Sequence, residues 1–267
     1  MTIGPYENNE IYCGHNVDLM AAMPDRCVDL TVTSPPYDNL RSYQGYNFDF
    51  EGVARELYRV TKPGGVVVWV VADATINGSE TGTSFRQALH FMSLGFNLHD
   101  TMIYEVAGTG AKGSNLAYWQ SFEFMFVLSK GQPSTVNRIA DVKNMRAGTI
   151  CTKGRIAVNG DEKDTRRRVV PEISTRTNLW RYQAGNNGDD ATGHPAPFPE
   201  ALARDHVMSW SNPGALVFDP FIGSGTTAKS ARQLGRDYLG FDISQEYVDL
   251  ARERLGATTP ALFTEAA

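Results

Sequence analysis

The chain has 267 residues, 42% of them hydrophobic and 21% charged, and its formal net charge at pH 7 is −5. This composition is typical of a globular protein with one large core and excludes an intrinsically disordered chain. The longest apolar run, Val66–Ala72, is much shorter than the roughly 20 residues of a membrane helix. The N-terminus has no signal-peptide pattern, so we expect a cytoplasmic protein that does not contact the membrane.

Cysteines and histidines give no support for a disulfide framework or a metal centre. The three cysteines, at positions 13, 27 and 151, are odd in number and far apart, and the five histidines form no HxH or HExxH pair. Structural zinc sites need ligands at short, regular spacings. The sequence therefore predicts no metal.

The first half of the chain alternates strand and helix patterns. A β-branched run from Val28 ends at Ser-Pro-Pro-Tyr and predicts a buried strand, and Phe50–Val60 has helical spacing of its apolar residues. A Lys-Pro-Gly-Gly turn then precedes the strand Val66–Ala72. We expect a further helix over 84–92 and strands near 98–106 and 122–128.

The segment 131–176 has a different character from its surroundings. It holds ten Lys or Arg against five Asp or Glu, which gives a local charge of +5, and it includes the Arg166–Arg168 triplet. A basic segment of this kind is either a solvated insertion or a contact surface for nucleic-acid phosphates. Composition alone leaves both interpretations open.

The last third returns to alternating elements. A helix is expected from about Pro199, followed by the strand ALVFD, a helix over 226–234, the strand DYLGFD and a final helix over 245–255. Alternation of strands and helices is typical of a doubly wound parallel sheet of the α/β class. No repeat of fixed period is present.

Two segments of this part are suited to bind a nucleoside. Asp219-Pro-Phe-Ile-Gly-Ser-Gly-Thr-Thr places two glycines in a strand-to-helix turn, where backbone can approach a ligand closely. A phosphate loop would need Lys after the last glycine, but Thr226 stands there. Asp242 ends the next strand, where its carboxylate could bind a ribose diol or could cap the helix that follows Ser244.

The first predicted strand ends in a third notable segment, Ser34-Pro-Pro-Tyr37. Proline stiffens the backbone and removes competing N–H donors, so the Pro35 carbonyl and the Ser34 hydroxyl could accept hydrogens from an amino group. Tyr37 offers a face for stacking a base. The plain alternative is a turn that only ends the strand.

Together, TSPPY, HPAPFP and FDPFIGSGTT resemble the motifs of the amino-directed DNA methyltransferases, over nearly the whole chain. The motif order is similar to that of the permuted β group. The resemblance implies a Rossmann-like doubly wound sheet of the S-adenosylmethionine-dependent methyltransferase type. It further implies a catalytic half over 1–130, a target-recognition insertion over 131–177 and a cofactor-binding half over 178–267. DNA is the implied partner, and the resemblance is compatible with a homodimer and with an associated restriction endonuclease.

The resemblance also implies roles for individual residues. The catalytic motif is Ser34, Pro35, Pro36 and Tyr37. The predicted cofactor-binding residues are His194, Pro195, Ala196, Phe198, Asp219, Phe221, Gly223, Gly225, Thr226 and Asp242. The predicted DNA-binding residues are Lys153, Arg155, Arg166, Arg167 and Arg168. One position departs from the family pattern: Gly14-His15 stands where relatives carry Gly-Asp, with Asp18 three residues later.

The implied reaction is direct attack of an exocyclic amino nitrogen on the sulfonium methyl of S-adenosylmethionine, without a covalent enzyme intermediate. Ser at the first motif position favours N4-cytosine over N6-adenine as the target, and adenine remains the alternative. A catalytically inactive DNA-binding regulator is an alternative of another class, and an enzyme acting on RNA or protein is a further one, which the motif order disfavours.

Overall fold

The structure is a computed structural model that describes residues 2–36, 48–107, 118–151, 168–183 and 199–256. Contacts divide the chain into two compact units, one formed by 1–137 together with 178–267 and the other by 138–177. Predictions that fall on 37–47, 108–117, 152–167, 184–198 or 257–267 lie outside the described residues.

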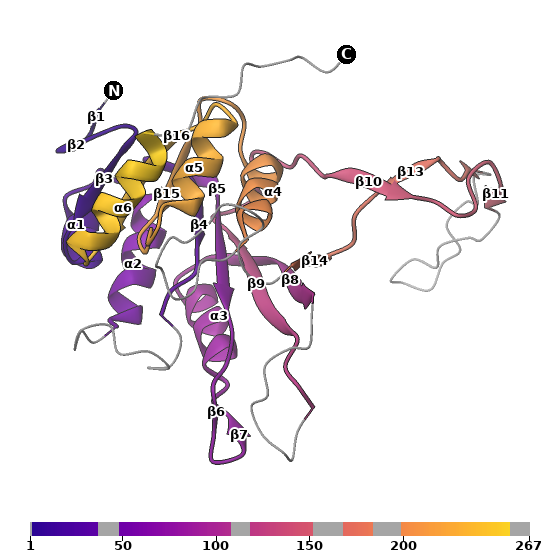
Figure 1. The fold of residues 1–267 in the computed structure, drawn as a ribbon, viewed down its shortest axis with the longest axis horizontal. Coiled ribbons are helices and arrows are strands. Elements are labelled where there is room, and N and C mark those ends of the chain that lie inside the picture. The colour runs from indigo at the N-terminus through magenta and orange to yellow at the C-terminus, as the bar shows by residue number, and fades with distance from the viewer. Residues whose placement is uncertain (1, 37–47, 108–117, 152–167, 184–198, 257–267) are drawn as a thin grey trace. The chain divides into compact units, whose positions relative to one another are not determined.

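The larger unit is built on an eight-stranded sheet (Figure 1). Its strand order is β14-β8-β9-β5-β4-β15-β16-β3. These strands are β3 (Glu10–Cys13), β4 (Val28–Thr33), β5 (Thr61–Val71), β8 (Asn97–Ala107), β9 (Phe122–Ser129), β14 (Leu179–Gln183), β15 (Leu216–Asp219) and β16 (Asp237–Asp242). All neighbours in this order are parallel except β9, which runs antiparallel to both β5 and β8.

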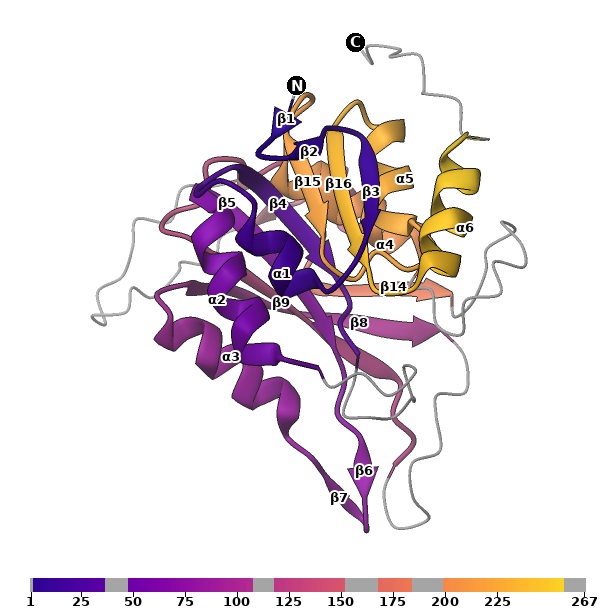
Figure 2. The ribbon, with the colours of Figure 1, turned by 90° about the vertical axis from the view of Figure 1, so that its left-hand side faces the viewer.

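Helices cover both faces of this sheet (Figure 2). One layer holds α1 (Asn16–Ala21), α2 (Phe50–Val60) and α3 (Thr83–Ser93), and the other holds α4 (Glu200–Trp210), α5 (Thr226–Gln233) and α6 (Gln245–Gly256). Central strands are therefore buried on both sides, and Val66–Val71 form a continuous buried run in β5. The fold is the predicted doubly wound α/β fold, with one antiparallel strand that alternation of elements does not reveal.

Two short hairpins complete the larger unit. β1 (Thr2–Ile3) pairs with β2 (Tyr6–Glu7), and β6 (Thr75–Ile76) pairs with β7 (Ser79–Glu80). Asn77 and Gly78 form the tip of the second hairpin with positive φ angles, as a two-residue turn of this kind requires.

One sequence expectation is wrong in detail. The Lys-Pro-Gly-Gly segment was expected to separate a helix from a strand, but it lies inside β5. Thr61 pairs with Val28 and Val66 with Leu30, so the strand carries an irregularity between these pairs. Gly64 takes a φ of +79° and donates its N–H to the Lys130 carbonyl. The glycine thus allows a bulge rather than ending the strand.

The smaller unit, 138–177, consists in its described part of two antiparallel pairs. β10 (Ala140–Lys143) pairs with β13 (Ile173–Thr175), and β11 (Ile150–Cys151) pairs with β12 (Arg168–Val169). The apolar side chains Val142, Ile150 and Val169 are exposed. The basic segment therefore contains strands, which its composition did not predict.

Candidate active site

The two predicted motifs lie at the carboxyl ends of neighbouring parallel strands. β4 ends at Thr33, directly before Ser34, and its neighbour β15 ends at Asp219. From β4 the chain continues through α2 to β5 on one side, whereas from β15 it continues through α5 to β16 on the other. Such a switch point opens a crevice beyond the strand ends, where α/β proteins bind their ligands.

The described part of the catalytic motif lies at this edge. Ser34 and Pro36 are half-buried and Pro35 is buried. Two successive prolines fix φ and leave the Ser34 and Pro35 carbonyls next to nitrogens without hydrogens. The motif is therefore a stiff, partly open strand end. Tyr37 lies outside the described residues.

Asp219 joins the two strand ends. Thr33 Oγ1 donates to Asp219 Oδ1 at 2.6 Å, and the Phe221 N–H donates to the same oxygen at 3.0 Å. Asp219 is only 1% exposed, and this burial raises the pKa of its carboxyl to about 7. Asp219 is therefore a buried anchor for the predicted cofactor turn, residues 219–227, and does not face solvent.

The turn after β15 depends on its glycines. Gly223 and Gly225 have φ angles of +49° and +84°, a region that favours glycine. A Cβ on Gly225 would also lie 3.0 Å from the Ala251 Cβ in α6. Gly225 precedes Thr226, the first residue of α5, so amides at the start of this helix are available to a ligand.

Asp242 is bonded within the chain through both carboxylate oxygens. Its Oδ2 accepts the Gly223 N–H at 2.9 Å, and its Oδ1 accepts the Ser244 N–H at 2.9 Å. The second bond closes a turn before α6, whereas the contact into the first turn of the helix comes from Ser244, whose Oγ accepts the Tyr247 N–H at 3.5 Å. Each carboxylate oxygen can accept a further hydrogen bond, so ribose binding remains a prediction for this residue. Burial raises the pKa of Asp242.

The departure from the family pattern lies at the same edge of the sheet. The Gly14 N–H donates to the Asp242 carbonyl at 2.9 Å, and the Asn16 side chain donates to the Pro220 carbonyl at 3.4 Å. His15 lies between these anchors, with its Nδ1 3.8 Å from the Asp18 carboxylate. The structure thus places His15 next to the turn after β15, at a position where the family resemblance leads us to expect an acid.

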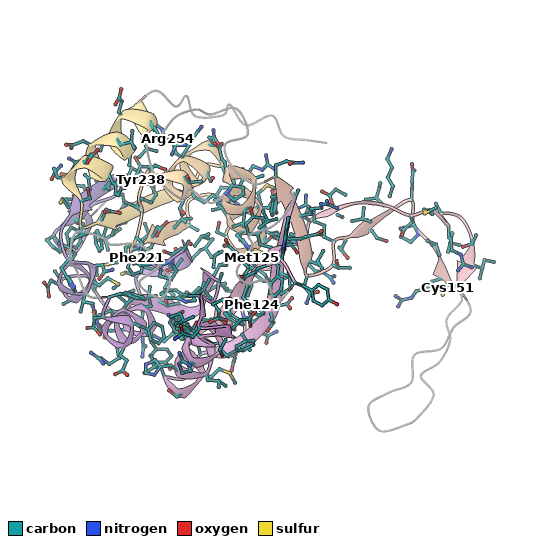
Figure 3. The ribbon with its side chains drawn as sticks, turned by 60° about the horizontal axis from the view of Figure 1, so that its bottom comes forward. Phe124, Met125, Cys151, Phe221, Tyr238 and Arg254 are labelled. Atoms are coloured by element: carbon teal, nitrogen blue, oxygen red, sulfur yellow. The ribbon has the colours of Figure 1, made fainter. Side chains whose placement is uncertain are left out.

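Phe221 provides an aromatic wall near the turn. Its ring centroid is 5.4 Å from that of Phe48 and 6.3 Å from that of Trp69. The ring lies near the middle of the larger unit (Figure 3). An aromatic face at a switch point is suited to pack against a flat ligand.

The remaining predicted site residues are mostly outside the described part of the chain. These are His194, Pro195, Ala196 and Phe198 of the predicted cofactor motif and Lys153, Arg155, Arg166 and Arg167 of the predicted DNA contacts. Arg168 is described: it lies in β12 and is exposed.

Sequence reasoning missed two residues of the site. Thr33 and Thr227 are both buried, and both hydroxyls contact the Asp219 carboxyl. Each threonine stands next to a recognised motif residue, but threonine is common in strands and helices, so residue type gave no signal. Asp29, by contrast, is structural: it accepts hydrogen bonds from Lys62 and from the Leu216 N–H at the opposite edge of the sheet.

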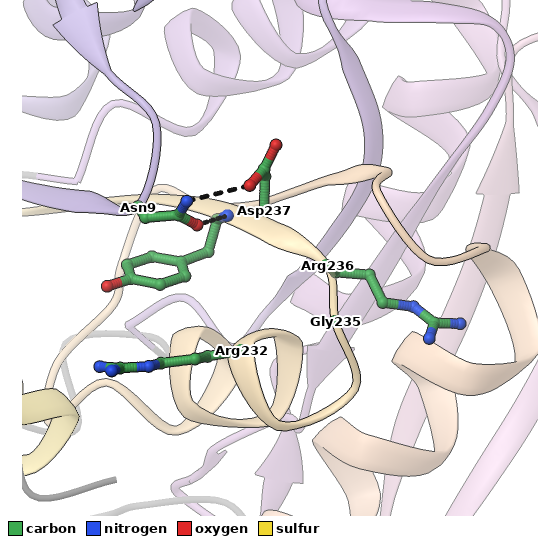
Figure 4. Close-up of a pocket in the computed structure, with 6 residues that line it drawn as sticks. Asn9, Arg232, Gly235, Arg236 and Asp237 are labelled. Atoms are coloured by element: carbon green, nitrogen blue, oxygen red, sulfur yellow. Dashed lines mark hydrogen bonds between the residues drawn. The ribbon is translucent and has the colours of Figure 1, made fainter. Parts of the chain in front are cut away.

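A hollow at the amino end of β16 lies away from this site (Figure 4). Its cationic groups are already bonded: Arg232 donates to the Leu255 carbonyl and Arg236 to the Ser211 carbonyl. Asp237 accepts hydrogen bonds from Asn8 and Asn9. These bonds tie together chain segments, so we assign the hollow no ligand.

The described residues contain neither a candidate metal site nor a candidate membrane helix. Within them, no cluster of three or more His, Cys, Asp or Glu could hold a metal ion. In the same residues, no helix is long and apolar enough to cross a membrane.

The chain matches known proteins over most of its length. The DNA methylase family N6_N4_Mtase matches residues 28–253. The orphan methyltransferase M.BamHII of Bacillus amyloliquefaciens is 55% identical over 238 residues, which are 86% of this chain and 89% of that one. The type II methyltransferase M.BglII of Bacillus subtilis is 28% identical and covers 92% of this chain and 69% of its own length.

Solved structures agree on the fold. The PvuII DNA methyltransferase, described as cytosine-N4-specific, superposes with a TM-score of 0.68 at 20% identity and covers 98% of this chain and 89% of its own. TTHA0409 from Thermus thermophilus, solved with S-adenosyl-L-methionine, gives a TM-score of 0.65 at 23% identity, with coverage of 97% and 99%. With the family match and the relative at 55% identity, these findings identify the chain as a member of the N6/N4 amino DNA methylase family, an amino-directed DNA methyltransferase.

Proposed function

We propose that this enzyme transfers a methyl group from S-adenosyl-L-methionine to the exocyclic amino group of cytosine in DNA, and so forms N4-methylcytosine. The observation that carries the choice of base is Ser34 at the end of β4, because the cytosine-directed members of the family more often carry Ser at this position. The fold similarity to a methyltransferase described as cytosine-N4-specific is consistent with this choice.

The strand end of β4 is suited to orient an amino group. The Ser34 hydroxyl and the Pro35 carbonyl are acceptors, and the two amino hydrogens of the base are donors. Hydrogen bonds to both hydrogens would turn the nitrogen lone pair toward the methyl group. The new bond is N–C and the broken bond is S–C, whose electron pair stays on sulfur so that the donor leaves as a neutral thioether, and the nitrogen gives one proton to water. Alignment supplies most of the rate enhancement in such a transfer.

The strand end of β15 is suited to hold the methyl donor. When bound, S-adenosyl-L-methionine supplies an electrophilic methyl group on a sulfonium. We assign its binding to Phe221, the Gly223–Gly225 turn and Asp242, together with Asp219 and Thr226 as supports. A side chain at the left-handed Gly225 would meet Ala251 of α6, so the turn keeps this conformation against α6 only with glycine at this position. His194, Pro195, Ala196 and Phe198 are predicted to contact the methionine part.

Base access and stacking are assigned to Tyr37. A base inside a duplex cannot reach a crevice at a sheet edge, so it must leave the stack at a cost of a few kcal/mol. Stacking on the Tyr37 ring would offset part of this cost.

The cysteines support a reaction without a covalent intermediate. Desolvation raises the pKa of the half-buried Cys27, and desolvation together with the carboxylates of Asp242 and Asp249 raises that of the exposed Cys13, so neither thiol has the lowered pKa of an activated nucleophile. Cys151 lies in the separate unit 138–177. Methylation of carbon 5 of cytosine would need an activated cysteine, whereas attack by an amino nitrogen needs none.

We assign target recognition to the unit 138–177. The basic segment 131–176, which includes nearly all of it, carries ten Lys or Arg against five Asp or Glu, although the whole chain is net negative. In the described part, Arg176 is paired with Asp141, whereas Arg168 is exposed on β12. Exposed arginines supply phosphate contacts that position a protein on DNA, and some read base edges. A homodimer, a partner restriction endonuclease and a cytoplasmic location remain predictions.

The test of the proposed function is identification of the product. Purified protein is incubated with S-adenosyl-L-methionine and mixed-sequence duplex DNA, and the DNA is digested to nucleosides for mass spectrometry. N4-methyldeoxycytidine is expected. N6-methyldeoxyadenosine would overturn the choice of base and keep the fold and the reaction. DNA binding without any methylated nucleoside would favour an inactive regulator.

A further inference from the structure

A buried chain of polar groups runs beneath the two motifs. Thr33 Oγ1 donates to Asp219 Oδ1 at 2.6 Å, and the Phe221 N–H donates to the same oxygen. Thr227 Oγ1 lies 2.8 Å from Asp219 Oδ2 and 3.1 Å from the Val32 carbonyl oxygen. The side chains of Thr33, Asp219 and Thr227 belong to residues that are at most 2% exposed. The chain therefore links β4, β15 and α5 without reaching bulk water.

If Asp219 is ionised, this hydrogen-bond network has fewer hydrogens than it has acceptors to satisfy. Thr227 has one hydroxyl hydrogen, but two oxygen acceptors lie within bonding distance of its oxygen. If the hydrogen serves Asp219 Oδ2, the Val32 carbonyl faces a hydroxyl lone pair. If the hydrogen is donated to the Val32 carbonyl, the Asp219 Oδ2 faces a lone pair of the Thr227 hydroxyl instead. A proton on Asp219 Oδ2 removes the conflict, because Asp219 then donates to Thr227, which donates to Val32.

The surroundings of Asp219 also disfavour a charge. The hydrogen bonds from Thr33, the Phe221 N–H and Thr227 lower the pKa of Asp219, but these groups are neutral and burial outweighs them. β16 contributes Asp242, a like charge that raises the pKa of Asp219 further. The nearby cations have other partners: Lys229 pairs with Glu200, and Arg254 donates to the Ser224 carbonyl. Burial without an opposite charge favours the neutral acid.

We propose that Asp219 is a neutral carboxylic acid in the free enzyme and a positioning residue for the reaction. Its proton completes a continuous series of hydrogen bonds from Val32 through Thr227 and Asp219 to Thr33. These bonds hold Thr33, the residue before Ser34, against the turn that follows β15. The protonation does not depend on the proposed function, whereas the role in the reaction rests on it.

Infrared spectroscopy tests the proton without requiring activity. The difference spectrum between the wild-type protein and Asp219→Asn is recorded at about pH 6, below the raised pKa of Asp219. We expect a C=O stretching band of a protonated carboxyl group that shifts in D₂O and decreases as the pH rises above about 7. A folded wild-type protein without this band at about pH 6 would overturn the proposal.

Kinetics tests the positioning role. Thr33→Val keeps the shape of the side chain but removes its hydroxyl, whereas Thr33→Ser keeps the hydroxyl. Because small misplacement of reacting groups costs up to about 100-fold in rate, we expect Thr33→Val to lower the single-turnover rate at least about 10-fold. Affinity for S-adenosyl-L-methionine should change much less, and Thr33→Ser should restore most of the rate. Equal rates for Val and Ser would refute the positioning role.

The pH profile connects the two tests. Asparagine resembles the neutral acid, because its Nδ2 donates and its Oδ1 accepts. The wild-type single-turnover rate should therefore fall as Asp219 loses its proton above about pH 7, and Asp219→Asn should lose this fall. A fall common to both proteins would contradict the proposal. If neither protein transfers methyl groups, the proposed function fails while the infrared band still decides the protonation.

Discussion

The ends of β4 and β15 lie side by side but are built in opposite ways. After β15 the carboxyl groups are bonded within the protein: Asp219 holds Thr33 and Phe221, and Asp242 holds Gly223 and Ser244. After β4 the chain is stiffened by two prolines, and Ser34 is half-buried at the end of the strand. We therefore assign the end of β15 to a preformed cofactor site and the end of β4 to the acceptance of a base.

The largest effect is expected at the open end. Tyr37→Ala removes the stacking face, and we expect single-turnover methyl transfer to fall at least about 100-fold, equivalent to about 2.7 kcal/mol. Affinity for S-adenosyl-L-methionine, measured by calorimetry, should stay within about threefold because stacking acts on the base and not on the cofactor. Tyr37→Phe is the matched control and should keep most of the rate. Unchanged turnover in Tyr37→Ala would show that stacking of the base on Tyr37 does not contribute to the reaction.

A substitution in the turn after β15 should impair cofactor binding and stability. Gly225→Val puts a β-branched side chain at a φ of +84° and against Ala251, which costs roughly 1–3 kcal/mol of stability. We expect loss of S-adenosyl-L-methionine binding as well as a lower melting temperature. Gly131→Val, at a φ of +80° with open space around it, is a control for strain alone. If both substitutions changed cofactor binding equally, the packing of Gly225 against Ala251 would have no specific role in cofactor binding.

The buried carboxyl group of Asp219 should make the free energy of unfolding depend on pH. The pKa of Asp219 is raised by burial from an ordinary 3.8 to about 7 in the folded state. Between these values the folded state holds a proton that the unfolded state has lost, so this contribution to stability is full below about pH 4 and is lost as the pH rises toward 7. Its upper bound is roughly 4 kcal/mol.

Denaturant unfolding of wild type and Asp219→Asn across this range measures the contribution. The free energy of unfolding of the wild-type protein should fall relative to that of the variant as the pH rises, and the difference should level off above about pH 7. Parallel curves for the two proteins would mean that Asp219 is ionised in both states.

The smallest effect is expected in the unit 138–177. Replacing Arg166, Arg167 and Arg168 by Gln should weaken DNA binding at all sequences and reduce the salt slope of log K by up to about 3, because each lost phosphate contact removes about one. Arg55→Gln on α2, an exposed arginine of the larger unit, is the control. A salt slope equal to that of the wild-type protein would place the phosphate contacts elsewhere.

Sequence patterns predicted the elements of the larger unit well because buried strands and amphipathic helices leave strong signals. The helix over Phe50–Val60 and the strand ending at Asp242 are confirmed with their bounds. The antiparallel direction of β9 was not predictable, since alternation of elements says nothing of strand direction. The bulge at Gly64 depends on Lys130, which is far away in the sequence.

Motifs identified the two strand ends but not how they are joined. The bonds from Thr33 and Thr227 to Asp219 cross between elements that only the fold brings together. The strand pairs of the unit 138–177 were missed because their few apolar residues, such as Val142 and Ile150, are exposed and leave no clear periodicity.

The division of labour between the two strand ends is tested most directly by one crossed measurement. Calorimetric affinity for S-adenosyl-L-methionine and the single-turnover rate on DNA, at saturating cofactor where this can be reached, are measured for Ser34→Ala and Gly225→Val. We expect Ser34→Ala to bind the cofactor with wild-type affinity and to transfer methyl groups slowly, whereas Gly225→Val should bind the cofactor more weakly. Loss of cofactor affinity in Ser34→Ala equal to that in Gly225→Val would contradict the separation of base and cofactor functions.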